Sequence, residues 1–269
     1  MKKIFATIVG IFLLSTYCFA QVKMVSQVKT VASKKAMAQK KTMNWTTKST
    51  AAHDLADKGS VHFMNAEFEQ AYQDFTAALK LDPNFTVPLV FMTNLTTDET
   101  KKMYAEKALK SAANKTVGEK LFASLADPKM TAENRREIWG QLHTMFPDGG
   151  MIGNFYVATR ATPEERFAAA QDYIKQFPTK PWMYNTIAYY YMLDKKDNEM
   201  AKKNLEKYLE LYPEGCNPYD SMGEFYLNSG DLENSEKYYK MALQKYPFYN
   251  SSINALQKMA DDKKKKNAN

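Results

Sequence analysis

The sequence predicts an all-α fold built from stacked helix–turn–helix pairs. Of its 269 residues 45% are hydrophobic and 13% aromatic, with only 10 glycines and 10 prolines. This composition favours helices around a substantial core over a β-sandwich. The spacing of small, aromatic and proline residues in 216–249, "CNPYDSMGEFYLNSGDLENSEKYYKMALQKYPFY", also recurs at 52–85 and 181–213. Such self-similarity is typical of a repeat architecture.

Each copy has a small residue where its two helices are expected to cross, because a larger side chain would force the helices apart. On the first helices these residues are Gly59, Ala188 and Gly223. On the second helices they are Ala71, Ala201 and Ser235. A proline follows each second helix and stops it, since proline cannot continue the helical ladder. These prolines are Pro83, Pro213 and Pro247.

The three copies resemble the tetratricopeptide repeat, a 34-residue helix–turn–helix with the pattern W-x2-L-G-x2-Y, then A-x3-F, then P. In the last copy Gly223 and Tyr226 match this pattern, and Tyr219 stands at the tryptophan position. The resemblance implies a right-handed α-solenoid of about six pairs, some of them degenerate, with a C-terminal capping helix. In this family the first helices line a concave surface that holds a peptide or protein segment.

The resemblance also implies which side chains would meet a partner. On the two C-terminal copies they are Trp182, Asn185, Tyr189, Asp220, Glu224 and Asn228. On the first copy they are His53, Ala56, Ser60 and Phe63, where chaperone-binding members carry Lys and Asn, so a carboxylate clamp is disfavoured. We expect an aromatic and acidic patch suited to a segment with apolar side chains and a Lys or Arg. The alternative is that Trp182 and Tyr189 pack between repeats.

The stretch 86–180 is predicted to hold nearly three degenerate pairs. Thr97 or Asp98 would cap one helix, and Pro163 stands where another begins. After the last copy, a helix from Ser251 to about Asp262 would cap the exposed end. The solenoid is therefore expected to span 49–262, followed by a lysine-rich tail at 263–269.

The N-terminus has the pattern of a cleaved secretory signal at 1–20. Lys2 and Lys3 precede an apolar run, and Cys18 and Ala20 are small residues before the expected cut. Lipidation of Cys18 is the alternative, although Tyr17 stands where a small residue is usual. A basic flexible leader at 21–48 would follow. Its Trp45 is a candidate to pack back on the first helix.

The net charge of +7 is concentrated at the chain ends. Residues 51–260 hold 24 basic and 28 acidic residues, a net charge of −4. A mildly acidic folded body argues against nucleic-acid binding, which needs a basic patch on the folded surface. No membrane span is expected after signal removal.

The sequence offers no catalytic motif, so no catalytic, cofactor-binding or metal-binding residues are predicted. His53 and His62 are nine positions apart, which is not chelating spacing. Cys216 is the only cysteine left after cleavage. We expect a monomeric, non-catalytic protein–protein interaction scaffold, exported to the periplasm or secreted. The alternative is a cell-envelope assembly factor or outer-membrane lipoprotein. An enzyme would require carboxylates that converge in space.

Overall fold

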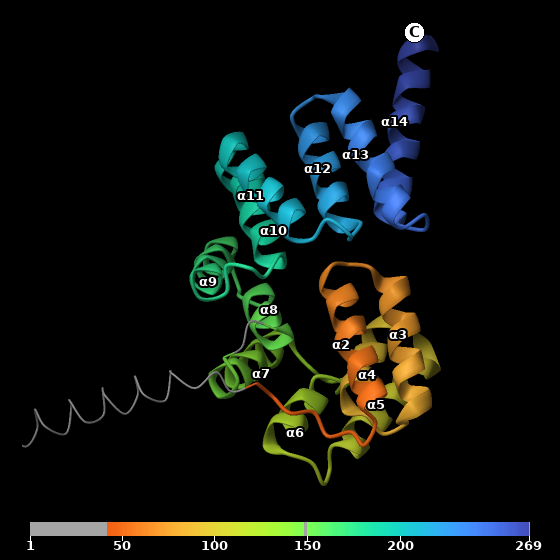
Figure 1. Cartoon of the computed structure of the whole chain (residues 1–269), viewed down its shortest axis with the longest axis vertical. Helices are drawn as coiled ribbons and strands as arrows, with labels where there is room; N and C mark the ends of the chain where they lie inside the picture. Colours follow the sequence, from red (N-terminus) through yellow and green to blue (C-terminus); the bar gives the residue numbers. More distant parts are fainter. Residues whose placement is uncertain (1–41, 148–149, 269) are drawn as a thin grey trace, which may run out of the picture. The chain divides into compact units, whose positions relative to one another are not determined.

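The computed structural model describes residues 42–147 and 150–268, which form helices joined by turns and short extended segments (Figure 1). The signal and most of the leader therefore lie outside the described residues. Six helix pairs follow one another. They are α2 (Thr50–Met64) with α3 (Phe68–Leu81), α4 (Thr86–Leu95) with α5 (Asp98–Ser111), α6 (Val117–Ser124) with α7 (Ala132–Met145), α8 (Met151–Ala158) with α9 (Pro163–Gln176), α10 (Trp182–Tyr189) and η1 (Tyr190–Lys195) with α11 (Asn198–Leu211), and α12 (Asn217–Asn228) with α13 (Leu232–Lys245). A last helix, α14 (Asn250–Ala268), packs on α13. The predicted all-α solenoid of about six pairs with a capping helix is confirmed.

The second helices of the pairs are regular, and the first helices are not. Each second helix has 14 residues, starting at positions 68, 98, 132, 163, 198 and 232. The first helices range from 15 residues in α2 to 8 in α6 and α8. The pairs at 86–176 are therefore degenerate because their first helices are short.

The predicted small residues lie at the helix crossings. A Cβ atom added to Gly59 would come within 2.8 Å of the Phe75 ring, and one on Gly223 within 2.8 Å of the Tyr239 ring. Ser235 donates a hydrogen bond of 2.9 Å to the Gly223 carbonyl. These approaches are too close for any larger first-helix residue unless the second helix moves.

The helix ends follow local capping chemistry, with two departures from the expected boundaries. Thr97 stands at the N-cap position of α5 and Pro163 in the first turn of α9, as predicted, although the Thr97 side chain makes no capping hydrogen bond. The Thr162 side chain caps α9. In contrast, α14 continues past Asp262 to Ala268 because the lysines there are good helix formers with no Pro or Gly among them. In the fifth pair the first helix continues as the π-helix η1, and Lys196, which follows η1, has φ of 55°.

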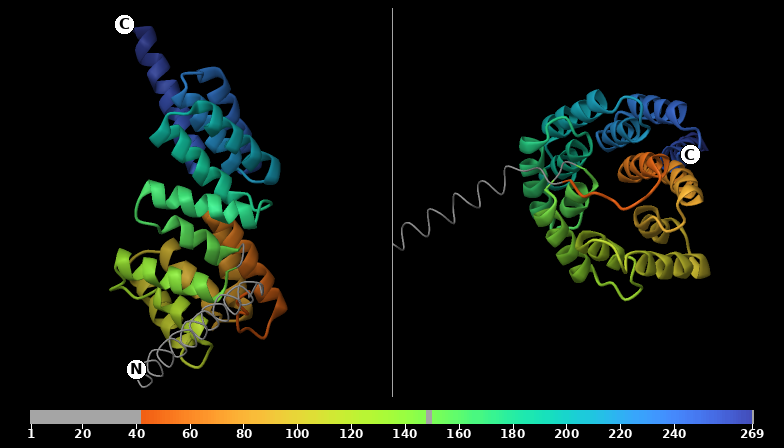
Figure 2. Two further views of the ribbon diagram at one scale, coloured as in Figure 1. Left: turned by 90° about the vertical axis from the view of Figure 1, so that its left-hand side faces the viewer. Right: turned by 60° about the horizontal axis from the view of Figure 1, so that its bottom comes forward.

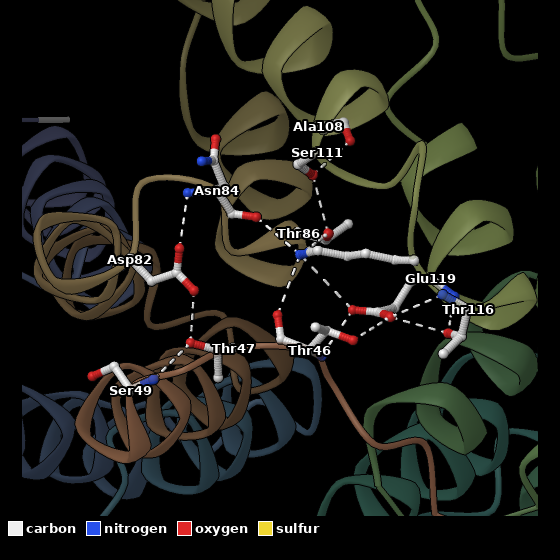
Figure 3. Close-up of polar contacts among 11 residues, drawn as sticks. Thr46, Thr47, Ser49, Asp82, Asn84, Thr86, Ala108, Ser111, Thr116 and Glu119 are labelled. Atoms are coloured by element: carbon white, nitrogen blue, oxygen red, sulfur yellow. Dashed lines mark hydrogen bonds and ion pairs between the residues drawn. The ribbon is translucent and has the colours of Figure 1, made fainter.

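The segment 42–49 belongs to the folded body, which corrects the expected extent of the flexible leader. Thr46 donates two hydrogen bonds of 2.8 Å, from its backbone N–H and its hydroxyl, to the buried carboxylate of Glu119 (Figure 3). Thr47 donates a bond of 2.7 Å to Asp82. The Trp45 ring packs edge-on against Phe122 of α6, 4.9 Å between centroids.

Lys115 sits at the centre of the same network. Its ammonium group donates to the carbonyls of Thr46 and Asn84 and to the Thr86 hydroxyl, and lies 3.9 Å from Glu119. Burial lowers the pKa of Lys115, while the Glu119 and Asp82 carboxylates oppose that shift. These contacts tie the extended segment to the turns before α4 and α6.

Across the part of the chain that the structure describes, every helix is too short or too polar to cross a membrane.

Candidate partner-binding surface

The first helices of the two C-terminal copies lie side by side. The Tyr189 hydroxyl on α10 donates a hydrogen bond of 2.6 Å to the Glu224 carboxylate on α12. One turn further along both helices, the Asn228 amide approaches the Met192 sulfur at 3.7 Å. The expected juxtaposition of Tyr189 and Glu224 is therefore confirmed.

Trp182 lies inside the protein rather than on its surface. Only 8% of the residue is exposed, and its indole N–H donates a bond of 3.1 Å to the Tyr173 hydroxyl on α9. The ring packs in the core cluster that includes Val157 of α8 and Met183. For Trp182, packing between repeats is the arrangement found, so this ring cannot anchor a partner.

Asp220 holds the capping helix. Only 5% of the residue is exposed, and its carboxylate accepts bonds of 2.9 Å from Ser251 and 2.6 Å from Ser252. Burial raises the pKa of Asp220, with a further contribution from Glu224, while the serine hydrogen bonds oppose the shift. The Asp220 side chain joins α12 to α14. Both of its carboxylate oxygens are used in that contact, so neither is left for a partner.

The other predicted residues remain accessible. Asn185, Tyr189 and Glu224 are partly exposed, and Asn228 is exposed. Asn185 and Tyr189 line a groove of about 360 Å³ between α10 and the start of α9, together with Leu193, which is 47% exposed. The side-chain oxygen of Asn185 is itself buried and has no hydrogen-bond partner among the described residues. The groove thus offers mainly an apolar wall, formed by Tyr189 and Leu193.

Tyr189 acts as a fixed donor in this surface. Burial, followed by the neighbouring Glu224 carboxylate, raises the pKa of its hydroxyl far above the usual value. The phenol therefore keeps its proton at physiological pH and keeps its bond to Glu224. That bond occupies one carboxylate oxygen and leaves the other available to a cation.

Sequence reasoning missed a contact that joins the first pair to the fifth and sixth. The Glu67 carboxylate, in a residue only 2% exposed, lies in the α2–α3 turn. It accepts bonds from the Tyr212 hydroxyl at 3.1 Å, the Cys216 backbone N–H at 3.0 Å and the Cys216 thiol at 3.3 Å. The Tyr208 hydroxyl donates a hydrogen bond of 2.6 Å to the side-chain oxygen of Asn65, which lies in the same turn. Figure 2 shows the first pair, in orange, lying beside the blue pairs.

This closing contact caps a helix from a distant part of the chain. Cys216 stands at the N-terminus of α12 and has no side-chain cap of its own. A carboxylate at that position interacts favourably with the helix dipole. Burial and the Glu67 carboxylate raise the pKa of the Cys216 thiol, so the thiol stays protonated and donates.

The residues expected on the concave surface of the first copy differ in exposure. Ala56 and Ser60 are buried, which corrects their assignment to an open groove, whereas His53 is partly exposed. The Phe63 ring is also partly exposed and packs against Phe91 at 4.8 Å and Phe155 at 6.0 Å between centroids.

The described residues contain no group of three His, Cys, Asp or Glu side chains that could hold a metal ion.

No protein-family model matches the chain, and no curated protein sequence matches it. It is similar in structure to Cut9 of the APC/C hetero-tetramer Cut9–Hcn1 (15% identity, 77% of this chain and 42% of Cut9, TM-score 0.48). It is also similar to the type IV pilus biogenesis factor PilW (13%, 77% and 99%, TM-score 0.44) and to Pseudomonas aeruginosa PilF (12%, 79% and 97%, TM-score 0.43). All three scores are below 0.5, so the fold assignment rests on the helix pairs and their crossings. The chain has a tetratricopeptide-repeat fold.

Proposed function

We propose that this protein is an exported, non-catalytic scaffold that binds a protein or peptide segment along α10 and α12. The observation that carries the proposal is the Tyr189–Glu224 pair, which stands beside a groove lined by Asn185, Tyr189 and Leu193. Aromatic, carboxylate and amide groups are thereby held on rigid helices, which reduces the ordering cost of binding on this side of the interface.

The chemistry of the surface indicates the kind of segment it would hold. An apolar side chain would pack on Tyr189 and Leu193 in the groove, and a Lys or Arg would meet the free oxygen of Glu224. Because aromatic anchors usually dominate binding energy, Tyr189 would contribute most.

Export is proposed from residues 1–20 alone. The expected mature N-terminus is Gln21, which mass spectrometry of the purified protein would identify. A diacylated Cys18 would instead favour the alternative of an outer-membrane lipoprotein that assists envelope assembly.

The binding proposal is tested by comparing full-length wild type with Glu224→Lys in affinity purification from cell-envelope extracts. Glu106→Lys is the matched control, since Glu106 is exposed on α5 and the same change of charge occurs far from the groove. We expect wild type and Glu106→Lys to enrich the same partner. Glu224→Lys should recover at least tenfold less of that partner. Equal recovery with all three proteins would exclude α12 as the binding surface.

A second measurement separates binding from folding. Circular dichroism melts should show similar transition temperatures for Glu224→Lys and Glu106→Lys. Nuclear magnetic resonance titration with the partner segment should then shift the signals of Asn185, Tyr189 and Asn228. Shifts confined to the convex second helices would contradict the proposal.

A further inference from the structure

The distribution of arginine in the sequence is uneven. The chain contains 33 lysines but only four arginines, Arg135, Arg136, Arg160 and Arg166, and no lysine stands between positions 130 and 174. Arginine differs from lysine in its planar fork of donors, which matches carboxylate geometry and remains charged beside apolar groups. All positively charged residues in this stretch are arginines, which suggests that the guanidinium group has a specific role here.

Three of the arginines are held around the C-terminal end of α8. Arg136 donates to the Thr159 carbonyl at 3.2 Å, Arg160 to the Arg136 carbonyl at 3.2 Å, and Arg166 to the Arg160 carbonyl at 3.1 Å. Arg160 also lies 4.2 Å from the centre of the Tyr156 ring. These backbone contacts fix the positions of the guanidinium groups.

In the part of the chain that the structure describes, their guanidinium groups form no direct ion pair with a carboxylate. Among the described residues, every ion pair to a carboxylate uses lysine or histidine, and none uses any of the four arginines. Glu133 and Glu137 share a shallow hollow with Arg136 and Arg160 without pairing with them. A guanidinium group has five N–H donors, so most of the donors here remain available to an anion.

Arg135 lies at the rim of an aromatic pocket. The pocket has a volume of about 320 Å³ and an apolar lining from the C-terminal ends of α2, α4, α6 and α8 and from one face of α7. Its rings are Phe63, Phe91, Phe122, Trp139 and Phe155. Trp139 stacks on Phe155 with 4.8 Å between centroids. A hollow remains here because α6 and α8 end after eight residues.

We propose that this aromatic pocket and the four arginines form a second binding surface, for an acidic polypeptide segment that carries a large apolar side chain. The pocket volume suits one aromatic or long aliphatic side chain, and Arg135 would meet a carboxylate next to it. The ligand is extended because Ala158, at the end of α8, lines both this pocket and the groove that contains Arg166. This goes beyond the proposed function, since its charge preference is opposite to that of Glu224.

The test uses the full mature chain and an array of blocked, fluorescently labelled peptides. Each peptide has one central residue flanked on both sides by two glutamates or by two lysines. The central residue is Phe, Trp, Leu or Ala. Fluorescence anisotropy should show tighter binding of glutamate peptides with Phe, Trp or Leu than of the Ala or lysine peptides.

Two variants examine the two halves of the recognition. Arg135→Glu should weaken binding of the acidic aromatic peptide at least tenfold, while Lys129→Glu, an equal change of charge at an exposed neighbouring site, should weaken it less than twofold. Asn94→Phe, at an exposed position on the pocket rim, should fill the pocket and abolish the preference for Phe over Ala.

Several outcomes would overturn the proposal. One is equal binding of acidic peptides with Phe and Ala, which would indicate attraction of any polyanion. Another is an equal effect of Arg135→Glu and Lys129→Glu. A third is no binding of any glutamate peptide. Tighter binding to vesicles of anionic lipid than to any peptide would assign the arginines to a membrane surface instead.

Discussion

The pairs at the two ends of the solenoid differ from those in its middle. In α2–α3 and α12–α13 a first helix of 15 or 12 residues crosses its partner at Gly59 or Gly223, and an aromatic ring covers the glycine. In α6–α7 and α8–α9 the first helix has 8 residues. The 14-residue second helices are common to both regions. The second helices therefore maintain the repeat, and the first helices determine whether space between pairs is filled.

This difference separates stability from recognition. Where first helices are long, their small residues are used for close packing and their polar residues for contacts between pairs. Where first helices are short, aromatic side chains from several pairs share one hollow, with Arg135 in its lining. Substitutions in the two regions should therefore have different effects.

The largest effect is expected from Ala242→Arg in the regular C-terminal pair. Ala242 is fully buried, so the change places excess volume and a charge into a helix crossing. The free energy of unfolding should fall by about 4 kcal/mol, measured by urea denaturation. Replacing Lys263, Lys264 and Lys265 with Gln is the control, because these exposed residues should together cost about 0.5 kcal/mol or less. Equal losses would mean that the crossing is misplaced.

Glu67→Ala should have the next largest effect. It leaves the Tyr212 hydroxyl and the Cys216 N–H buried without their acceptor, at a cost of about 3 kcal/mol. Glu69→Ala, on the exposed side of the same helix, should cost about 0.5 kcal/mol or less. Hydrogen exchange should then increase at the start of α12 and in the α2–α3 turn. Unchanged exchange there would mean that the closing contact does not form in solution.

Two glycine substitutions compare an end pair with a middle pair directly. Gly59→Ala should destabilise by about 1–2 kcal/mol, because its Cβ would overlap the Phe75 ring. Gly140→Ala, in α7, should stabilise by about 0.5–1 kcal/mol, since nothing lies within 4 Å of the added atom and alanine favours helix. Thermal melts of both variants would show whether each substitution raises or lowers the melting temperature. A stabilising Gly59→Ala would contradict the tight crossing.

The smallest effect concerns pH and Asp220. Its folded pKa is raised by burial above the ordinary 3.8, so between these two values the folded state holds more protons than the unfolded state. The stabilising contribution of Asp220 is therefore complete below pH 3.8 and is lost as pH rises through the folded pKa. Asp220→Asn should remove this dependence of stability on pH. Parallel pH profiles for the two proteins would disprove the shift.

The elements that follow local rules could be predicted from the sequence. Gly59, Gly223 and Pro163 act through sterics within one pair, so their positions in the repeat were enough. Glu67 could not be predicted in the same way, because its partners are about 149 positions away and nothing in the α2–α3 turn indicates them. The burial of Trp182 depends on packing against the preceding pair, where α9 supplies its partner Tyr173, which the repeat pattern of a single pair does not indicate.

The arginine surface had a signal in the sequence that repeat spacing does not reveal. Four arginines fall within positions 135–166 of a chain that otherwise uses lysine. Composition along the chain would have identified that region. The aromatic pocket beside it depends on where α6 and α8 end, and short degenerate helices give weak boundary signals.

The bond between Glu67 and Cys216 limits how this protein can evolve. In an open solenoid each pair contacts only its neighbours, so a pair can be duplicated or deleted with local consequences. Here an inserted pair would rotate and shift every later pair, and α12 would no longer present its N-terminus to Glu67. A change in the number of pairs would therefore break the closing contact, while substitutions on the surface of the short first helices would leave it intact.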